Sequence, residues 1–190
     1  MVVVADSRHE LPVVHTQDGF HVVGQWAADG PLQRERVLGT DHPDTLNSRN
    51  NLAGAYRSAD RINKAITLYE ATLANRQRIL GPDHPNILTS RNNLAGAYES
   101  AGRIDEAITL YEATLANRER ILGPDHPKTL TSRNNLAGAY ESAGRIDEAI
   151  TLYEATLANR ERILGPDHPK TLTSRNNLAG ARRQANLSKD

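Results

Sequence analysis

The sequence predicts an all-α solenoid, in which antiparallel helix pairs stack one on another. The phrase SRNNLAGAY begins at Ser48 and returns at Ser90 and Ser132, always 42 residues later, and at Ser174 it returns with Arg182 in place of tyrosine. Within each unit the apolar residues follow the spacing of one buried helix face. Because a single helix pair cannot bury its own apolar stripe, repeated pairs must stack to form a continuous core.

The period divides the chain into six segments. Residues 1–31 do not fit it, and they contain Phe20 and Trp26, so they are either a remnant or leader outside the array or an apolar cap on its first helix. The remaining segments are a partial repeat with the end of a second helix and its loop, three full repeats, and a terminal capping helix with a tail: 32–44, 45–86, 87–128, 129–170 and 171–190. A terminal repeat needs a polar outer face, which Arg182 supplies.

The first helix of a unit is expected from Pro85 to Ala101, with equivalents in the other units. Its apolar face follows i, i+3, i+4, i+7 spacing, with the residues Leu94, Ala97, Tyr98 and Ala101. Gly102 supplies the left-handed residue that ends this helix. Asp60 takes that place in the first unit, where we therefore expect a costlier turn.

The second helix is expected from Ile104 to Leu122. Its buried stripe consists of Ile104, Ala107, Ile108, Tyr111 and Leu115, widened by Leu110, Thr114 and Ile121. The run Arg118–Arg120 is interpreted as a solvated face. The phrase LGPDHP follows, in which Gly123 and Pro124 end the helix, either Asp125 or His126 caps the next one, and Pro127 suits its first turn.

The composition excludes several functions. Basic and acidic side chains balance at 23 each, so nucleic acid is not an expected partner, because phosphate binding relies on a basic excess. The absence of cysteine excludes thiol catalysis, disulfides and cysteine-bound zinc. No apolar run approaches the ~20 residues that span a membrane, and no secretory signal is recognisable. The sequence therefore predicts a cytoplasmic protein without membrane contact or cofactor.

Recurring Asp-His pairs are the best candidates for chemistry, at Asp41–His42, Asp83–His84, Asp125–His126 and Asp167–His168. Such a pair can orient a general base or a metal ligand. Equivalent residues in a stack lie about 10 Å apart, however, whereas ligands converge to about 2 Å from a metal ion. We therefore assign the pairs to the capping loops and predict that the chain is not an enzyme and binds no metal.

The unit resembles the tetratricopeptide repeat. The residues that carry this resemblance are Leu94, Ala95, Tyr98, Ala107, Tyr111 and Leu115, while Arg91 stands where the family has tryptophan. The usual period is about 34 residues. The period of 42 here, with NNLA in the first helix, is similar to that of kinesin light chains and many bacterial signalling proteins. The resemblance covers about residues 32–185 and implies a right-handed superhelix that binds proteins.

In that family, the face of the first helix opposite Leu94 lines a concave groove. Here this face carries Thr89, Asn92, Gly96 and Glu99, and so predicts a ladder of asparagines along the array. An amide both donates and accepts hydrogen bonds, and glycine lets a partner's backbone approach closely. The predicted peptide-binding residues are Asn50, Asn92, Asn134, Asn176, Thr89, Thr131, Arg57, Glu99, Glu141 and Arg183, so the groove is acidic in the middle and basic at its ends.

The main hypothesis is an interaction scaffold that binds a peptide or protein partner in this groove, as part of a larger signalling or regulatory protein. Two alternatives stay open. The asparagines can instead bond only neighbouring helices, particularly the second of each pair: Asn51, Asn93, Asn135 and Asn177. Near-identical units can also stack end to end between chains, which would make a self-assembling structural module without a dedicated ligand.

Overall fold

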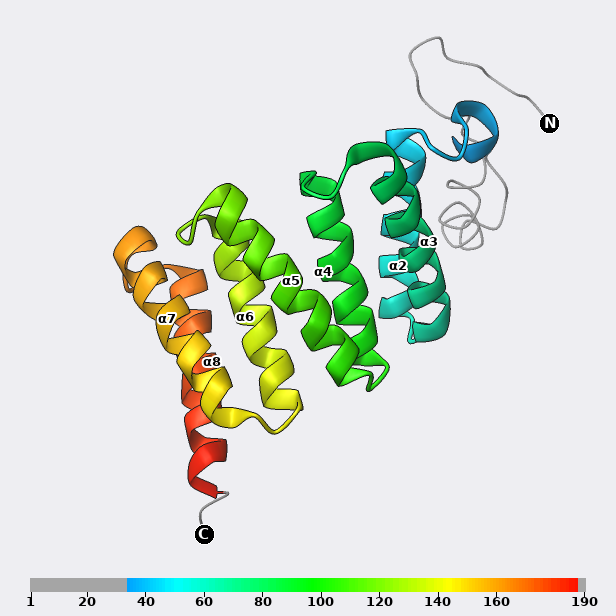
Figure 1. The fold of residues 1–190 in the computed structure, drawn as a ribbon. Helices are drawn as coiled ribbons and strands as arrows, with labels where there is room; N and C mark the ends of the chain where they lie inside the picture. Colours follow the sequence, from blue (N-terminus) through cyan, green and yellow to red (C-terminus); the bar gives the residue numbers. More distant parts are fainter. Residues whose placement is uncertain (1–33, 188–190) are drawn as a thin grey trace, which may run out of the picture.

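The computed structural model describes residues 34–187, which form a stack of helices and contain no β-strand (Figure 1). After a helical turn at 34–38, the helices are α2 (Pro43–Ser58), α3 (Ile62–Leu80), α4 (Pro85–Ser100), α5 (Ile104–Leu122), α6 (Pro127–Ser142), α7 (Ile146–Leu164) and α8 (Pro169–Leu187). The all-α solenoid of antiparallel pairs is therefore confirmed. The expectations for 1–31, including the cap with Phe20 and Trp26, lie outside the described residues.

The core runs through the stack as three similar clusters. Each is built from a first helix, the second helix of the same repeat and the first helix of the next, so that every cluster has a buried tyrosine at its centre. These tyrosines are Tyr69, Tyr111 and Tyr153. Leu94 and Leu136 are equally buried, at 4% exposed each, which is the equivalence that stacked repeats require.

Histidine, and not aspartate, caps the first helices. The Nδ1 atom of His126 accepts a hydrogen bond from the backbone N–H of Lys128 at 3.1 Å, and His42, His84 and His168 make the equivalent bond. Pro127 occupies the first helical turn, as predicted. This bond satisfies one of the free donors at the helix start and fixes the tautomer of the ring.

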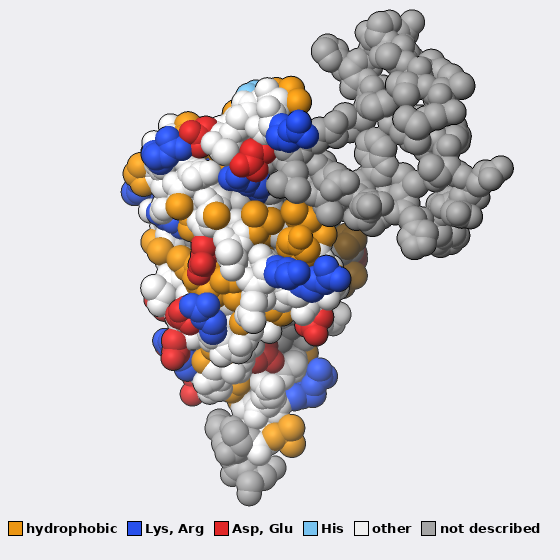
Figure 2. Space-filling view, turned by 90° about the vertical axis from the view of Figure 1, so that its right-hand side faces the viewer, with side chains coloured by type: hydrophobic (Ala, Val, Ile, Leu, Met, Phe, Trp, Pro, Cys, Tyr) orange, Lys and Arg blue, Asp and Glu red, His pale blue; other side chains and the backbone are white. Residues whose placement is uncertain are grey.

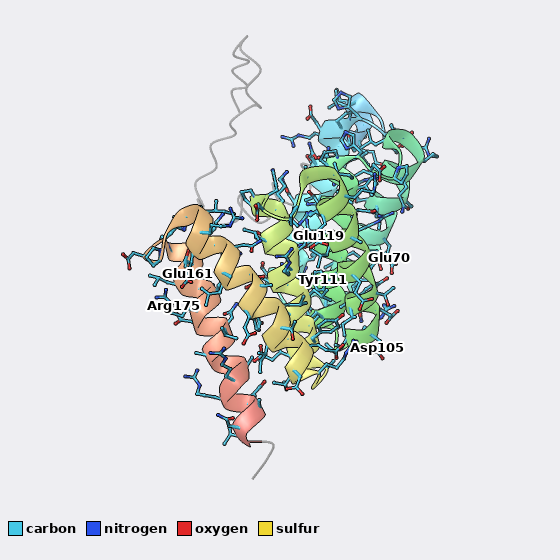
Figure 3. The ribbon with its side chains drawn as sticks, turned by 60° about the vertical axis from the view of Figure 1, so that its left-hand side comes forward. Glu70, Asp105, Tyr111, Glu119, Glu161 and Arg175 are labelled. Carbon is cyan, nitrogen blue, oxygen red and sulfur yellow. The ribbon has the colours of Figure 1, made fainter. Side chains whose placement is uncertain are left out.

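In two of the LGPDHP phrases, at 80–85 and 122–127, the aspartate joins neighbouring repeats instead. Asp125 lies 2.5 Å from an Nη2 of Arg162, one repeat further along, and Asp83 pairs with Arg120 in the same way. A second inter-helix pair joins Glu161 to Arg175 at 2.8 Å, and both residues are labelled in Figure 3. The Asp and His of one pair therefore serve different contacts, since one links repeats and the other caps a helix.

The turn between the two helices of a repeat uses a left-handed residue. Gly102 has a φ of 74°, and the following N–H of Arg103 reaches back to the carbonyl of Tyr98 at 2.9 Å, which completes a Schellman motif. Asp60 adopts the same conformation, with a φ of 58°, in the first repeat. This is the turn at which the sequence predicted strain, because an L side chain is disfavoured there.

Two expectations for the second helix were wrong. Arg118, placed on a solvated face by the sequence, is only 5% exposed. Its Nη1 donates to the Oγ of Ser132 at 2.6 Å and to the carbonyl of Lys128 at 3.0 Å, so this arginine connects its repeat to the next. Ile121, expected to widen the buried stripe, is 38% exposed. Arg118 therefore continues the buried stripe of Tyr111, Thr114 and Leu115 by one more turn, and the stripe ends before Ile121.

Charges of both signs are mixed over the face shown in Figure 2, with hydrophobic side chains between them. Arg182, which replaces tyrosine in α8, keeps the partner of that tyrosine: it pairs with Glu154 at 2.7 Å, as Tyr140 donates to Glu112 at 2.7 Å. A charged side chain therefore makes the same inter-helix contact at the end of the described array.

Candidate functional site

A cavity of about 410 Å³ lies where the predicted groove was expected. It is lined by residues of α2, α4, α5, α6 and α7: Arg57, Asn92, Asn93, Gly96, Glu99, Ser100, Tyr111, Asn134, Asn135, Gly138 and Tyr153. Almost all of these are polar side chains or glycine, in contrast to the apolar clusters behind them. We call this cavity the groove cavity.

The structure brings together some of the predicted binding residues and not others. Those that line the groove cavity are Arg57, Asn92, Glu99 and Asn134. Those that do not are Asn50, Thr89, Thr131, Glu141, Asn176 and Arg183. The hydroxyls of Thr89 and Thr131 donate to backbone carbonyls of their own helices, at 3.0 and 2.9 Å. These two threonines are therefore engaged locally.

The asparagines form a ladder between neighbouring first helices. The Nδ2 of Asn135 donates to the Oδ1 of Asn92 at 3.1 Å, and equivalent bonds join Asn93 to Asn50 at 3.3 Å and Asn177 to Asn134 at 3.1 Å. The second asparagine of each pair therefore donates to the first asparagine of the preceding repeat, and this is the kind of bond that one alternative expected for these residues.

Some amide groups of the ladder make no hydrogen bond within residues 34–187. In each bond one asparagine uses an Oδ1 and the other an Nδ2, so the Nδ2 of Asn92 and the Oδ1 of Asn135 make no hydrogen bond within residues 34–187. The same holds one repeat on, for the Nδ2 of Asn134. Both asparagines of the pair line the groove cavity, which therefore offers amide donors beside amide acceptors.

Tyrosines that the sequence assigned only to the core also reach the groove cavity. Tyr111, labelled in Figure 3, is 3% exposed, and its hydroxyl donates to Glu99 at 3.3 Å. Tyr153 donates to Glu141 at 3.2 Å. Burial, and then the charge of the neighbouring glutamate, raises the pKa of both phenols. The sequence feature that could have predicted this contact is the glutamate, Glu99 or Glu141, on the helix face that carries the groove glycines.

The groove glycines make room for these hydroxyls. A Cβ on Gly96 would stand 3.3 Å from the Oη of Tyr111 and 2.5 Å from the Nη1 of Arg57, so any larger residue would displace both. A glycine that was expected to admit a partner's backbone therefore already accommodates two side chains of the chain itself. Arg57 makes no ion pair within residues 34–187, so its charge at this end of the groove cavity is free to meet an anion.

Residues 34–187 contain no group of three histidine, aspartate or glutamate side chains that could hold a metal ion. The Asp-His pairs are spread along one edge of the stack, where all four histidines cap helices and Asp41, Asp83 and Asp125 pair with arginines. None of the helices in the described range has both the length and the apolar character needed to cross a bilayer.

Comparison with known proteins identifies the family. The sequence matches the tetratricopeptide repeat over residues 32–77, 51–120, 92–162 and 134–190. These matches span most of the chain, which therefore belongs to the tetratricopeptide repeat family, a right-handed α-solenoid scaffold that generally mediates protein–protein interactions and is typically not enzymatic.

Solved structures refine this assignment. A Q17M variant of a putative kinesin light chain from Podosopora anserina, with nearly identical repeats, is 31% identical, with a TM-score of 0.76 over 87% of this chain and 78% of that one. BtubC of P. vanneervenii is 22% identical, with a TM-score of 0.72 over 86% and 67%. The Sgt2 domain of Aspergillus fumigatus is 18% identical, with a TM-score of 0.56 over 78% and 83%. A search of the curated proteins found no match. The predicted likeness to kinesin-light-chain repeats is confirmed.

Proposed function

We propose that this chain is an interaction scaffold that holds an extended segment of a partner protein in the groove cavity. The observation that carries the proposal is the set of uncommitted amides along the asparagine ladder. An extended backbone presents alternating N–H and C=O groups, and the free Nδ2 of Asn92 and Oδ1 of Asn135 are complementary to that pattern. Such contacts provide affinity that depends little on the partner's sequence.

The charges of the groove add a preference to this backbone contact. Glu99 lines the groove cavity and accepts from the hydroxyls of Tyr111 at 3.3 Å and Ser142 at 3.5 Å. Glu141, one repeat further along, accepts from the phenol of Tyr153 at 3.2 Å. Arg57 lies at the other end. We therefore expect the partner to place a lysine or arginine opposite the two glutamates, with an acidic residue toward Arg57.

The test is a binding titration with fluorescently labelled extended peptides, measured by anisotropy. The variant Asn92→Ala/Asn134→Ala removes two donors and should weaken the selected peptide about thirtyfold, at about 1 kcal/mol for each bond. Asn117→Ala, on α5 and outside the groove cavity, is the matched control and should bind like the parent chain. Circular dichroism checks that the variants fold. Equal affinity in the double variant and the control would remove the groove from this function.

A second arm tests the charge preference. The variant Glu99→Gln/Glu141→Gln should weaken peptides with a central lysine about fivefold, and leave those with a central glutamine unchanged, because screened surface charges contribute modestly. If both peptides weaken equally, the glutamates support the groove without selecting charge.

The self-assembling module remains the alternative. The observation that favours it is the end of the described stack, where Leu172 is 41% exposed although the equivalent Leu88 and Leu130 are 2% exposed. Light scattering over a hundredfold range of concentration tests it. A mass that rises with concentration, and returns to that of one chain in Leu172→Glu, would support stacking through α8. A constant mass would exclude it.

A further inference from the structure

A second kind of cavity occurs twice along the edge of the stack where the LGPDHP phrases lie. The first, of about 130 Å³, lies between α4, α5 and α6, and the second, of about 140 Å³, between α6, α7 and α8. Their walls are proline, leucine and isoleucine side chains, and each contains an arginine, a histidine and a lysine. We call them edge cavity 1, with Arg118, His126 and Lys128, and edge cavity 2, with Arg160, His168 and Lys170.

The arginine of each edge cavity is buried without a carboxylate. Arg118 is 5% exposed and Arg160 is 6% exposed. Both donate only to neutral oxygens: Arg160 bonds the Oγ of Ser174 at 2.7 Å and the carbonyl of Lys170 at 3.0 Å. No ion pair within residues 34–187 includes either guanidinium. Burial lowers the pKa of both arginines, since the buried charge lacks a counter-ion.

The first repeat provides an internal comparison. There the Nη2 of Arg76 donates to the Oδ1 of Asn47 at 2.7 Å. Threonine replaces that asparagine in the next two repeats, as Thr89 and Thr131, whose hydroxyls are used within their own helices. The Nη2 atoms of Arg118 and Arg160 therefore make no hydrogen bond within residues 34–187.

The other polar groups of the edge cavities are also available. Because the Nδ1 of His126 accepts a bond from the chain, the neutral ring carries its proton on Nε2, where it can donate. Lys128 is exposed and makes no ion pair in the described range, whereas the first repeat has Asn86 at this place. Asp125, which lines edge cavity 2, is held by Arg162 at 2.5 Å and by Asn159 at 3.0 Å. The carboxylate that lines edge cavity 2 is therefore already paired.

An arginine, a histidine and a lysine that line one cavity with aliphatic walls match a carboxylate on a short hydrocarbon stem. A carboxylate accepts from guanidinium and ammonium groups in strong, charge-assisted bonds, while its methylenes lie against the leucine and isoleucine side chains. A cavity of about 130 Å³ holds one such side chain and little more. Equivalent points of neighbouring repeats lie about 10 Å apart. In a polyproline II segment, residues three apart point to the same side and lie about 9 Å apart.

We propose that edge cavities 1 and 2 receive the side chains of two glutamates, three residues apart, from an extended acidic segment of a partner protein. This docking surface is separate from the groove cavity and uses none of its lining residues. The two glutamates bring counter-ions to Arg118 and Arg160, which the chain itself does not supply.

The probe is the peptide acetyl-Glu-Pro-Pro-Glu-amide, and the control peptide has glutamine at both glutamate positions. Titration of the isotope-labelled full chain, followed by nuclear magnetic resonance, should shift the side-chain signals of Arg118, Arg160 and His126. The glutamine peptide should bind at least tenfold more weakly, because it loses the charge-assisted bonds. Equal binding of the two peptides, or shifts confined to other residues, would overturn the proposal.

Two variants separate this site from general attraction of an acidic peptide. Lys128→Met/Lys170→Met removes the exposed cations and leaves the buried arginine bonds intact, and should weaken the glutamate peptide about tenfold. Lys64→Met, on α3, makes the same kind of charge change away from the edge cavities and should have little effect. If Lys64→Met weakened binding as much, per lysine removed, as Lys128→Met/Lys170→Met, the affinity would depend only on the net charge of the chain, and the proposal would be overturned.

The internal comparison gives a variant that adds no charge. Thr89→Asn/Thr131→Asn supplies the two arginines with the partner that Arg76 already has, and should also weaken the glutamate peptide, severalfold. The groove variant Asn92→Ala/Asn134→Ala should bind this peptide like the parent chain. If it does not, the peptide lies in the groove, and the edge assignment fails while the groove function stands.

Discussion

The first repeat and the third repeat have the same fold and different contacts. Units 45–86 and 129–170 differ at seven positions, yet α2 and α6 both have 16 residues, and α3 and α7 both have 19. All the apolar residues are identical in the two units, whereas the differences fall at the turn, on the surface and at the ends of the helices. The stack therefore depends on the apolar stripe and on the helix signals, and the surface is left to vary.

Two of these differences change the contacts of buried side chains. Glu141 accepts from the buried Tyr153 at 3.2 Å, whereas Arg57 holds the equivalent place above Tyr69 without an ion pair within residues 34–187. Arg160 has two neutral partners, whereas Arg76 has a third in Asn47. The buried arginine of the first repeat therefore has a side-chain partner that the buried arginine of the third repeat lacks, whereas the phenol of the third repeat has a glutamate partner that the phenol of the first repeat lacks.

The largest effect expected from this comparison is at the buried arginines. Arg118→Ala leaves two buried acceptors without a donor and should lower the free energy of unfolding by about 3 kcal/mol. Arg76→Ala also removes the bond to the exposed Asn47 and should cost about 1 kcal/mol more. Urea unfolding measures both. The control Arg78→Ala removes an exposed pair and should cost under about 1 kcal/mol. A control loss as large as that of Arg118→Ala would contradict the burial argument.

A smaller effect is expected at the turn. Asp60 has a φ of 58°, where the equivalent Gly144 has a φ of 74°. Asp60→Gly should raise the free energy of unfolding by about 1 kcal/mol, because glycine adopts this conformation without steric cost. The reverse change, Gly144→Asp, should lower the free energy of unfolding by a similar amount. Thermal melts of both variants measure these changes. If both changes destabilise, Asp60 has a contact that offsets its strain.

The smallest effect concerns the start of the second helix. Arg145 pairs with Glu148 at 2.5 Å, whereas the first repeat has Arg61 and Lys64 at these places. Lys64→Glu should restore the pair and stabilise the chain by about 0.3 kcal/mol. A double-mutant cycle with Arg61→Ala measures the coupling, and high salt should remove it. A gain that survives in Arg61→Ala would come from the helix dipole instead.

Much of this architecture could be predicted from the sequence, because its signals are local. Period, helix ends and the αL residues Gly102 and Asp60 all follow from neighbours within a few positions. The burial of Arg118 could not be predicted in this way, because the acceptor on Ser132 belongs to the next repeat. Helical spacing predicted that Asn92 and Glu99 share one helix face. It could not predict that the phenol of Tyr111, on another helix, contacts that face.

By itself, the sequence determined the helices, their pairing, their repetition and hence the solenoid, since each of these follows from periodic burial and from the residues that start and stop a helix. Only the tertiary structure decided which polar groups are already paired and which are free. It bonded Asn135 to Asn92, left the other amide groups of both uncommitted, and buried Arg118 and Arg160 without a counter-ion. The physical reason is that hydrogen bonds between repeats depend on distances across the stack, which the order of residues along one helix does not contain.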